Sequence, residues 1–420
     1  MRTAKDSGFE WIGEIPISWK LYKGKYMFAQ RNLRGNNIEL QLLSPTQKFG
    51  VVPQSVYEEL SGMNAVKLNE NTNLSALKTI HKGDFCISLR SFQGGFEYSE
   101  YEGVVSPAYQ IFYPIINVSR GYYKYLFKEC GFIEKMNSYT MTLRDGKNIA
   151  FADFGNTYIP CPPVDEQRRI SDFLDIKCAE IDALTADIQT QIDTLEQYKR
   201  SVITETVTKG LDSNAEMKDS GVQWIGNMPA HWDVIRGKYI LRYMQKPVRE
   251  DDGVITCFRD GEVTLRSNRR EDGFTMSDKE IGYQGIDVGD LVVHGMDGFA
   301  GSIGISDSRG KASPVLNVLE TDQNKRYIMY YLRSMAYSDV FLALATGIRV
   351  RSCDLRWNKL AELSYPVPPL NEQNAIVKHI DSVLSKADAV IADKKAQLAT
   401  LDEYKKSLIF EYVTGKKEVI

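Results

Sequence analysis

The sequence lacks long apolar runs, paired cysteines and an excess of positive charge. No stretch of eighteen or more uncharged apolar residues occurs among its 420 residues, so no transmembrane helix is predicted. Residues 1–6 lead into no short apolar segment of the signal-peptide kind. With 43% apolar and 25% charged residues, we expect a soluble, folded, cytoplasmic protein with two or more domains.

Motifs for metal binding and catalysis are also missing. The six cysteines form no Cys-x-x-Cys pair, and the four histidines form no ligand pair, so neither a zinc site nor a disulfide framework is predicted. The Pro-Pro sites at 161–164 and 367–370 lack the flanking residues that adenine amino-methyltransferases use, and no ATP-binding glycine loop occurs. We predict that the chain is not an enzyme and that it binds no metal or cofactor by itself.

The net charge of −3 excludes a protein that coats nucleic acid through bulk positive charge. Any DNA binding must therefore come from local basic patches.

What is present is an internal repeat. Residues 6–19, DSGFEWIGEIPISW, recur as residues 219–232, DSGVQWIGNMPAHW, and the tripeptide 24–26 recurs at 237–239 with the same offset of 213. A second match at an offset of 206 pairs residues 160–170, PCPPVDEQRRI, with 366–376, PVPPLNEQNAI. The chain is therefore predicted to contain two diverged copies of one unit.

The middle of each copy differs more than its ends. Gly83-Asp84 corresponds to Gly289-Asp290, and each pair precedes a short apolar run, 84–89 or 291–294, that is typical of a strand. The scaffold is thus repeated while the remaining surface diverges.

The segment after each proline pair is predicted to be a long helix. Asp165 and Asn371 are placed to cap helices that begin at the following Glu-Gln pair. Apolar residues then recur at alternating steps of four and three, the a/d pattern of a coiled coil. In copy one they are Ile170, Leu174, Ile181, Leu184, Ile188, Leu195, Tyr198 and Val202. In copy two they are Ile376, Ile380, Val383, Ala387, Val390, Leu401, Tyr404 and Leu408.

The connectivity predicts an antiparallel pair of helices. Helix one leads from domain one to domain two, and helix two leads away from domain two, so equal domain-to-helix angles give a pseudo-twofold arrangement. Residues 166–209 would span about 66 Å as one helix, enough to hold two domains apart. A helical hairpin that only buries core is the simpler interpretation of the same stripe.

DNA contacts are expected mainly from the globular domains, because residues 166–210 carry nine Asp/Glu against six Lys/Arg. The clearest basic segment is 346–359, and its counterpart in copy one is 140–148. Arginine suits this role because its planar fork pairs with phosphate or guanine. The candidates in these segments are Arg144, Lys147, Asn148, Arg349, Arg351, Arg356 and Lys359. Ordinary solvated surface is the alternative interpretation.

Three weaker candidate groups complete the predicted interface. Arg266, Arg269 and Arg270 form a basic stretch that residues 271–272 could neutralise. Arg90 and Gln93 lie on a predicted loop, and the alternative interpretation of this segment is a polar hairpin without a binding role. His294 ends the matching strand of copy two, where a histidine is more often structural than base-reading.

The proline motif, the Glu-Gln helix start, the Tyr-Lys pairs at 198–199 and 404–405 and the repeated Trp-containing opening together resemble the specificity subunit of type I restriction-modification systems. The resemblance implies an α+β fold with two target-recognition domains, 1–160 and 213–366, alternating with two spacer helices, 161–212 and 367–420. Contact residues cannot be transferred, because the recognition domains vary greatly in this family.

The resemblance also implies partners and a function. Each domain would read one half of a bipartite site in double-stranded DNA, while the helices set the spacer and dock two methyltransferase subunits. Two restriction subunits would complete the complex. S-adenosylmethionine, ATP and Mg would be bound by those partner subunits. The alternatives are a coiled-coil adaptor that never touches DNA and, more weakly supported, a stand-alone nuclease or methylase.

Overall fold

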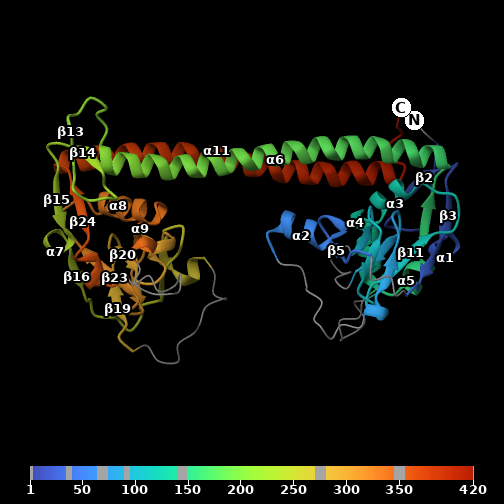
Figure 1. The fold of residues 1–420 in the computed structure, drawn as a ribbon, viewed down its shortest axis with the longest axis horizontal. Coiled ribbons are helices and arrows are strands. Elements are labelled where there is room, and N and C mark those ends of the chain that lie inside the picture. The colour runs from blue at the N-terminus through green and yellow to red at the C-terminus, as the bar shows by residue number, and fades with distance from the viewer. Residues whose placement is uncertain are drawn as a thin grey trace. The chain divides into compact units, whose positions relative to one another are not determined.

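The structure is a computed structural model that describes residues 3–34, 40–63, 74–88, 95–139, 149–269, 281–344 and 355–419 (Figure 1). The chain forms two compact units: unit 1 is Met1–Ile188 with Ala396–Ile420, and unit 2 is Gln189–Lys395. Each unit combines a globular part with segments of both long helices, a division that differs from the four consecutive domains predicted above. Across the described ranges, no helix has the length and apolar character needed to cross a membrane.

Unit 1 contains a four-stranded antiparallel sheet in the order β4-β11-β8-β9 and four two-stranded sheets, β1-β2, β3-β12, β5-β6 and β7-β10. The strands are β1 (Ala4–Asp6), β2 (Glu14–Pro16), β3 (Lys20–Lys23), β4 (Phe28–Arg31), β5 (Leu43–Thr46), β6 (Gly50–Pro53), β7 (Lys78–Ile80), β8 (Phe85–Ile87), β9 (Phe96–Tyr98), β10 (Gly103–Val105), β11 (Gln110–Pro114) and β12 (Tyr158–Cys161). The shorter helices are α1 (Gly24–Met27), α2 (Gln54–Ser61), α3 (Arg120–Leu126), α4 (Cys130–Ser138) and α5 (Phe151–Asn156).

Unit 2 contains the sheet β16-β23-β20-β21 and the pairs β13-β14, β15-β24, β17-β18 and β19-β22. The strands are β13 (Met217–Asp219), β14 (Asn227–Pro229), β15 (Asp233–Arg236), β16 (Arg242–Met244), β17 (Ile255–Cys257), β18 (Val263–Leu265), β19 (Gln284–Ile286), β20 (Leu291–His294), β21 (Ile303–Ile305), β22 (Gly310–Ala312), β23 (Leu316–Glu320) and β24 (Ser364–Val367). The shorter helices are α7 (Gly237–Ile240), α8 (Lys325–Tyr337), α9 (Val340–Ala343) and α10 (Trp357–Leu360).

The two units repeat one strand order. Each sheet of unit 1 has a counterpart in unit 2 that is formed by strands in the same sequence order and with the same antiparallel pairing. The strands predicted at 84–89 and 291–294 are β8 and β20, the third members of the two four-stranded sheets. The α+β fold class and the internal repeat are therefore confirmed.

Tyrosines on a short helix connect each sheet to the long helices α6 (Val164–Lys209) and α11 (Leu370–Val413). In unit 2, α8 lies between the sheet and the long helices (Figure 1). The hydroxyl of its buried Tyr327 lies 3.0 Å from the carbonyl oxygens of both Val207 and Pro366. In unit 1, Tyr122 of α3 donates to the Val413 carbonyl at 2.7 Å. The end of one long helix is thus bound into each core.

Both long helices begin earlier than the sequence predicted. They start at Val164 and Leu370, directly after the prolines, so Asp165 and Asn371 lie inside the first turn and are not caps. The reason is that the Pro163 carbonyl accepts the first helical bonds, from Glu166 and Gln167. The predicted cap positions were therefore wrong by two residues.

The glutamine of each Glu-Gln pair connects the helix start to the globular part. Gln167 donates to the Pro162 carbonyl and accepts from the Ser119 amide, both at 2.8 Å. Gln373 repeats this arrangement with Pro368 at 2.8 Å and Asn324 at 2.9 Å. Because a buried side-chain amide must be hydrogen-bonded, this double contact explains why the motif occurs twice.

The repeated tryptophans pack against the helix ends. Trp19 and Trp232 are fully buried, and each lies beside a glycine that follows a long helix, Gly415 and Gly210 respectively. Both glycines adopt a left-handed conformation, with φ of 75° and 76°, which glycine accepts without the penalty of a side chain. Trp232 also donates to Glu372 at 3.0 Å, joining the end of α6 to the start of α11.

The two helices run antiparallel in each unit. In unit 1, the ring of Phe173 packs against that of Tyr412, and Lys405 pairs with Asp182 at 2.6 Å. In unit 2, Lys394 bonds Gln191, and Lys199 pairs with Asp388 at 2.6 Å. Numbers rise along one helix as they fall along the other, which confirms the predicted direction.

The packing stripe differs in phase from the predicted one. Ile170, Leu174, Ile181 and Ile188 are buried on α6, and Ile376, Ile380, Ala387 and Leu408 on α11, whereas Leu195, Val202, Val383 and Leu401 are half-buried. Four predicted packing residues are exposed instead: Leu184, Tyr198, Val390 and Tyr404, with exposed fractions of 47%, 51%, 43% and 55%.

Cys178, Ile192 and Ile391 are buried instead, and each lies one residue after a position of the predicted stripe. After residue 174 the prediction had a step of three residues, whereas the structure has a step of four, to residue 178. Every second contact position is therefore one residue later than predicted.

Candidate nucleic-acid interface

Eight of the thirteen predicted DNA contacts lie outside the described residues: Arg90, Gln93, Arg144, Lys147, Asn148, Arg270, Arg349 and Arg351. The five described ones all belong to unit 2 and are Arg266, Arg269, His294, Arg356 and Lys359. The candidate interface of unit 2 is therefore built here from these five and their neighbours.

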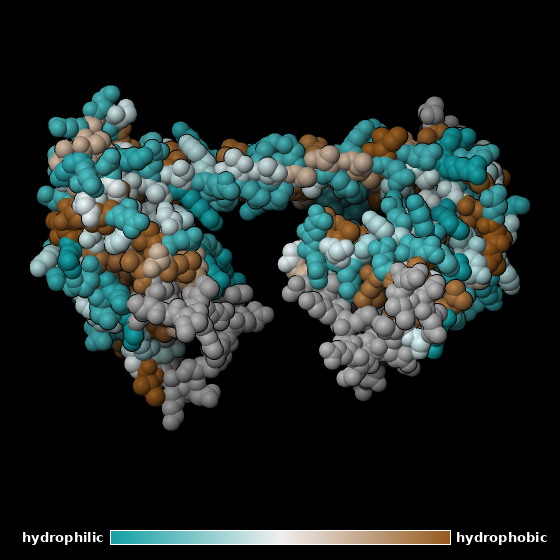
Figure 2. All heavy atoms as spheres, viewed as in Figure 1, coloured by the Kyte–Doolittle hydropathy of each residue, from teal (hydrophilic) through white to brown (hydrophobic). Residues whose placement is uncertain are grey.

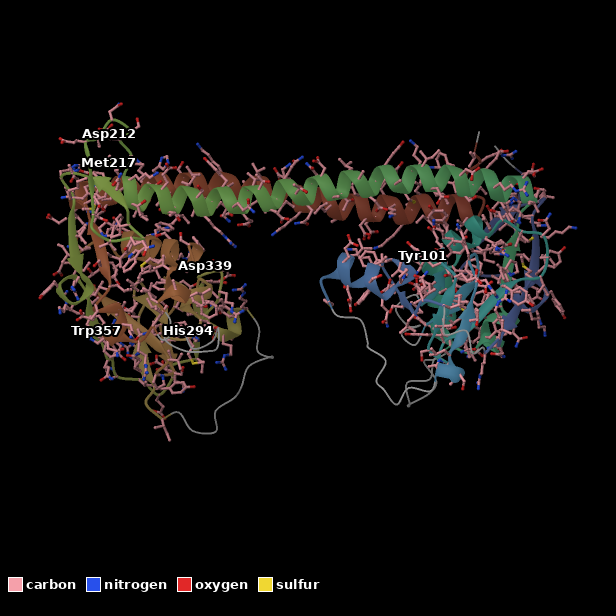
Figure 3. The ribbon with its side chains drawn as sticks, viewed as in Figure 1. Tyr101, Asp212, Met217, His294, Asp339 and Trp357 are labelled. Atoms are coloured by element: carbon pink, nitrogen blue, oxygen red, sulfur yellow. The ribbon has the colours of Figure 1, made fainter. Side chains whose placement is uncertain are left out.

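The turn after β20 and the segment that begins at Leu355 lie together. The Leu355 amide donates to the Gly295 carbonyl at 2.8 Å, and the side chain of Leu355 is buried beside Gly298, where a Cβ would lie only 2.6 Å from it. His294 and Arg356, predicted as separate candidates sixty residues apart, are thus the immediate neighbours of two hydrogen-bonded residues. Figure 3 shows His294 and Trp357 within the globular part of unit 2, away from α6 and α11.

Arg356 and Lys359 are exposed at the start of α10. Arg356 is the N-cap residue of this helix, and the following Trp357 stacks on Tyr243 with ring centroids 6.1 Å apart. Two long cationic side chains at one solvent-facing turn can contact phosphate oxygens, and the arginine fork can also reach a guanine edge.

His294 stabilises its own turn. Its Nδ1 accepts the backbone N–H groups of Met296 at 3.2 Å and Asp297 at 2.9 Å. Burial lowers the pKa of His294, although the nearby Asp297 acts in the opposite direction. The ring is therefore neutral near pH 7, and because Nδ1 is an acceptor, its proton is on Nε2. The geometry supports the structural interpretation of this histidine and leaves only the Nε2–H side to face a ligand.

Arg269 is paired with carboxylates that the sequence analysis did not consider. It contacts Asp260 at 2.6 Å and Glu262 at 3.1 Å and lies over the Phe258 ring, 4.3 Å from its centroid. Residues 271–272, the predicted neutralising pair, lie outside the described residues. Arg266 is half-buried, and its Nε lies 3.4 Å from the Thr256 hydroxyl. Arg269 therefore presents less uncompensated charge than its sequence suggests.

A network of ion pairs supports the same unit and was missed from the sequence. Lys246 contacts Asp287 at 2.9 Å and Asp290 at 2.7 Å, and Arg309 bonds Asp252 at 2.9 Å and also Asp287. Hydrogen bonds from Lys246 and Arg309 lower the pKa of Asp287 to about 2. Because Asp252 and Asp290 are almost completely buried, these cations are needed to compensate their charge.

Unit 1 holds the matching aspartate in the same way. Arg31 donates to the buried Asp84 at 2.7 Å. The repeated Gly-Asp pairs, interpreted above only as turns, were the signal for these buried carboxylates. In the part of the chain that the structure describes, no group of three or more His, Cys, Asp or Glu side chains is placed to hold a metal ion.

The architecture defines the class of this protein. It is an α+β protein in which one globular frame is repeated and each copy is followed by a long helix.

Comparison with known proteins shows which family this chain is similar to. Residues 20–194 match the type I restriction modification DNA specificity domain. Two specificity subunits of type I restriction enzymes from Methanocaldococcus jannaschii, MjaX and MjaVIII, are 25% and 24% identical over 62% and 67% of this chain. The matched stretches span 59% and 68% of those two proteins. The chain is therefore similar to the specificity subunits of type I restriction-modification systems, in agreement with the resemblance of its motifs.

Solved structures show the same fold. The HsdS subunit from Thermoanaerobacter tengcongensis aligns over 98% of this chain with a TM-score of 0.52 and 14% identity. A chain from a study of complex assembly and conformational transition of the type I restriction-modification system aligns over 96% with a TM-score of 0.67 and 15% identity. These alignments cover 100% and 99% of the two solved chains.

Proposed function

We propose that this chain is the non-catalytic, sequence-specific DNA-binding subunit of a type I restriction-modification complex. Each globular domain reads one half of a bipartite site in double-stranded DNA. The observation that carries the proposal is the repetition of one frame, strand for strand, in a chain whose two copies contain different basic segments in their sequence. Two such readers in one chain fit two different half-sites better than they fit two copies of one ligand.

The long helices set the spacer between the half-sites in this proposal. Each is uninterrupted, and the 46 residues of α6 correspond to about 69 Å at 1.5 Å per residue. A continuous helix fixes a length that a flexible linker would leave variable.

The helices also offer a surface for partner proteins. Leu184 and Tyr198 of α6 match Val390 and Tyr404 of α11 at the repeat offset, and all four are exposed. Apolar residues interrupt the hydrophilic surface of the helical pair in Figure 2. We infer that two methyltransferase subunits dock on these matched positions and that two restriction subunits complete the complex. S-adenosylmethionine, ATP and Mg belong to those partners, and the assembly acts in the cytoplasm.

The test is selection from a random duplex library with the full chain. We expect enrichment of one gapped motif, with two defined halves and a spacer of constant length. A coiled-coil adaptor, the alternative function, would enrich no motif. Cleavage or methylation of DNA by the purified chain alone would contradict the non-catalytic assignment.

The basic segment of unit 2 can be tested in the same assay. Replacing Arg349, Arg351 and Arg356 together with Ala is expected to weaken recognition of one half-site only. Each phosphate contact that is lost should reduce the slope of log affinity against log salt by about 0.9. Unchanged affinity and salt dependence would remove these arginines from the interface.

A further inference from the structure

A side-chain amide, buried in unit 2 and half-buried in unit 1, occupies the same position of the sheet in both units. Asn317 lies in β23 opposite Val293 of β20, and Gln110 lies in β11 opposite Ile87 of β8. Asn317 is only 4% exposed and has apolar neighbours on both sides in its strand. Burying a polar group in such a strand is unfavourable unless hydrogen bonds compensate for the lost water. The partners of these amides therefore indicate what they are for.

Asn317 joins two segments that are far apart in the sequence. Its Nδ2 donates to the carbonyl of Val293 and to that of Leu355, both at 3.1 Å. An asparagine amide has two N–H donors, and here each one serves a different segment. Val293 immediately precedes His294, and Leu355 immediately precedes Arg356. The amide therefore holds together the two strands of backbone that carry the described candidate contacts.

Backbone hydrogen bonds complete this junction. Gly295 donates to the Val315 carbonyl at 2.7 Å and accepts from the Leu355 amide at 2.8 Å. The two segments are consequently fixed relative to each other and to β23 at adjacent residues. The fixed backbone therefore sets the direction of the side chains that extend from this junction.

Gln110 plays the corresponding part in unit 1. Its Nε2 donates to the Ile149 carbonyl at 2.9 Å, and its Oε1 accepts the Phe151 amide at 2.7 Å. Ile149 is the residue that follows 140–148, just as Leu355 follows 345–354, the two ranges that contain the stronger predicted contacts. The two units thus use different amides, in strands of different sequence, to hold the same point of the chain.

We propose that Asn317 and Gln110 are positioning residues for DNA recognition, one for each half-site. The proposal rests on the proposed function, because it assigns the amides to the reading of bases. Hydrogen bonds to base edges are directional and fail after a small displacement, whereas long lysine and arginine side chains follow a displaced phosphate. Loosening the junction should therefore reduce sequence discrimination and leave most of the general affinity for DNA.

The experiment compares half-site selectivity in the full-length chain. Duplex-library selection is carried out with Asn317→Ala and with Asn317→Leu, which refills the volume if the Ala variant does not fold. The same changes at Gln110 address the other unit. Gln284→Ala is the matched control, because Gln284 is a buried amide that donates at 2.7 Å to Leu316 of the strand itself.

Changes at Asn317 should lower discrimination about tenfold at one or more base positions of a single half-site. This half-site is the one that the arginine replacement in unit 2 affects. Changes at Gln110 should affect the other half, and Gln284→Ala should lower the melting temperature without altering either. Total binding to random duplex at low salt should stay within about threefold, since phosphate contacts supply it.

Two results would overturn the proposal. The first is full selectivity in the Asn317 variants, and the second is an equal loss in both halves, which would make the amide a general stabiliser. If the unmodified chain enriches no motif, the proposed function fails instead. The amides can then still be examined by hydrogen exchange: faster exchange at Gly295 and Leu355 in Asn317→Ala, with Val292 unchanged, would show the junction to depend on Asn317.

Discussion

At the scale of single residues, the matching tryptophans of the two copies differ in the hydrogen bonding of their indole N–H groups. The indole N–H of Trp224 donates to the Tyr331 hydroxyl at 3.1 Å. The indole N–H of the matching Trp11 is buried and has no acceptor among the described residues. Tyr327 of unit 2 corresponds to Tyr122 of unit 1. The residue that corresponds to Tyr331 is therefore Leu126, which has no hydroxyl to accept the hydrogen bond.

This difference predicts unequal effects of one substitution. Trp224→Phe removes a buried hydrogen bond, whereas Trp11→Phe removes only an indole N–H that is already unsatisfied. Trp224→Phe should therefore cost about 0.5–1.5 kcal/mol more in the free energy of unfolding. Urea denaturation of the two variants measures the difference, and equal losses would contradict it.

The ion pairs of unit 2 predict a dependence of stability on pH. The pKa of Asp287 is about 2, and a hydrogen bond from Arg309 also lowers the pKa of Asp252. A carboxyl whose pKa falls on folding stabilises the native state above its unfolded pKa, and this contribution is lost as pH falls through the folded value. Unit 2 should accordingly lose stability between about pH 4 and about pH 2.

Arg309→Met removes the guanidinium that Asp252 and Asp287 share and should flatten that part of the stability profile. Arg242→Met is the control, because the pair of Arg242 with Asp322 is exposed on both sides and contributes little. Thermal unfolding at several pH values compares the variants with the unmodified chain. Parallel profiles for Arg309→Met and the unmodified chain would rule out this role for the network.

At the scale of elements, the phase of the helical stripe is the feature that sequence periodicity missed. Val390 and Ile391 are neighbours on α11, but Val390 is 43% exposed and Ile391 is 4% exposed. Ile391→Ala should lower the free energy of unfolding by about 2–4 kcal/mol. Val390→Ala should change it by less than about 0.5 kcal/mol.

Denaturation followed by the helical circular dichroism signal measures both changes. The reverse order would restore the phase that was predicted from the sequence. In the proposed function Val390 has a different use, so Val390→Ala should weaken methyltransferase binding while leaving the fold intact.

At the scale of the whole molecule, helix length is proposed to set the spacer of the DNA site. Removing one heptad from both α6 and α11 preserves the phase of their packing and shortens each by about 10 Å. The enriched motif should then have a spacer shorter by about 3 base pairs, at 3.4 Å each. The same removal from α6 alone breaks its register with α11 and should lower stability. An unchanged spacer after removal of one heptad from both helices would contradict the proposal that helix length sets the spacer.

Much of the fold could be predicted because the relevant signals are local or repeated. Offsets of 213 and 206 between similar motifs are enough to establish the duplication, and a sustained apolar period is enough to predict the two helices. The direction of helix packing followed from connectivity alone. The family resemblance came from the same motifs, and their structural roles, such as that of Gln167, became clear only with the contacts in view.

The sequence by itself determined the duplication, the two helices and the absence of recognisable catalytic motifs, because each depends on residue type and spacing along the chain. The phase of the stripe, the charge compensation of Arg269 and the hydrogen bond that brings together the segments of His294 and Arg356 were decided only by tertiary structure. A period of 3.5 allows either of two adjacent residues to face a partner, and an ion pair depends on which strands lie side by side. Asn317 is the clearest example, because the residues around it in the sequence do not indicate that its two N–H groups bind carbonyls 62 residues apart.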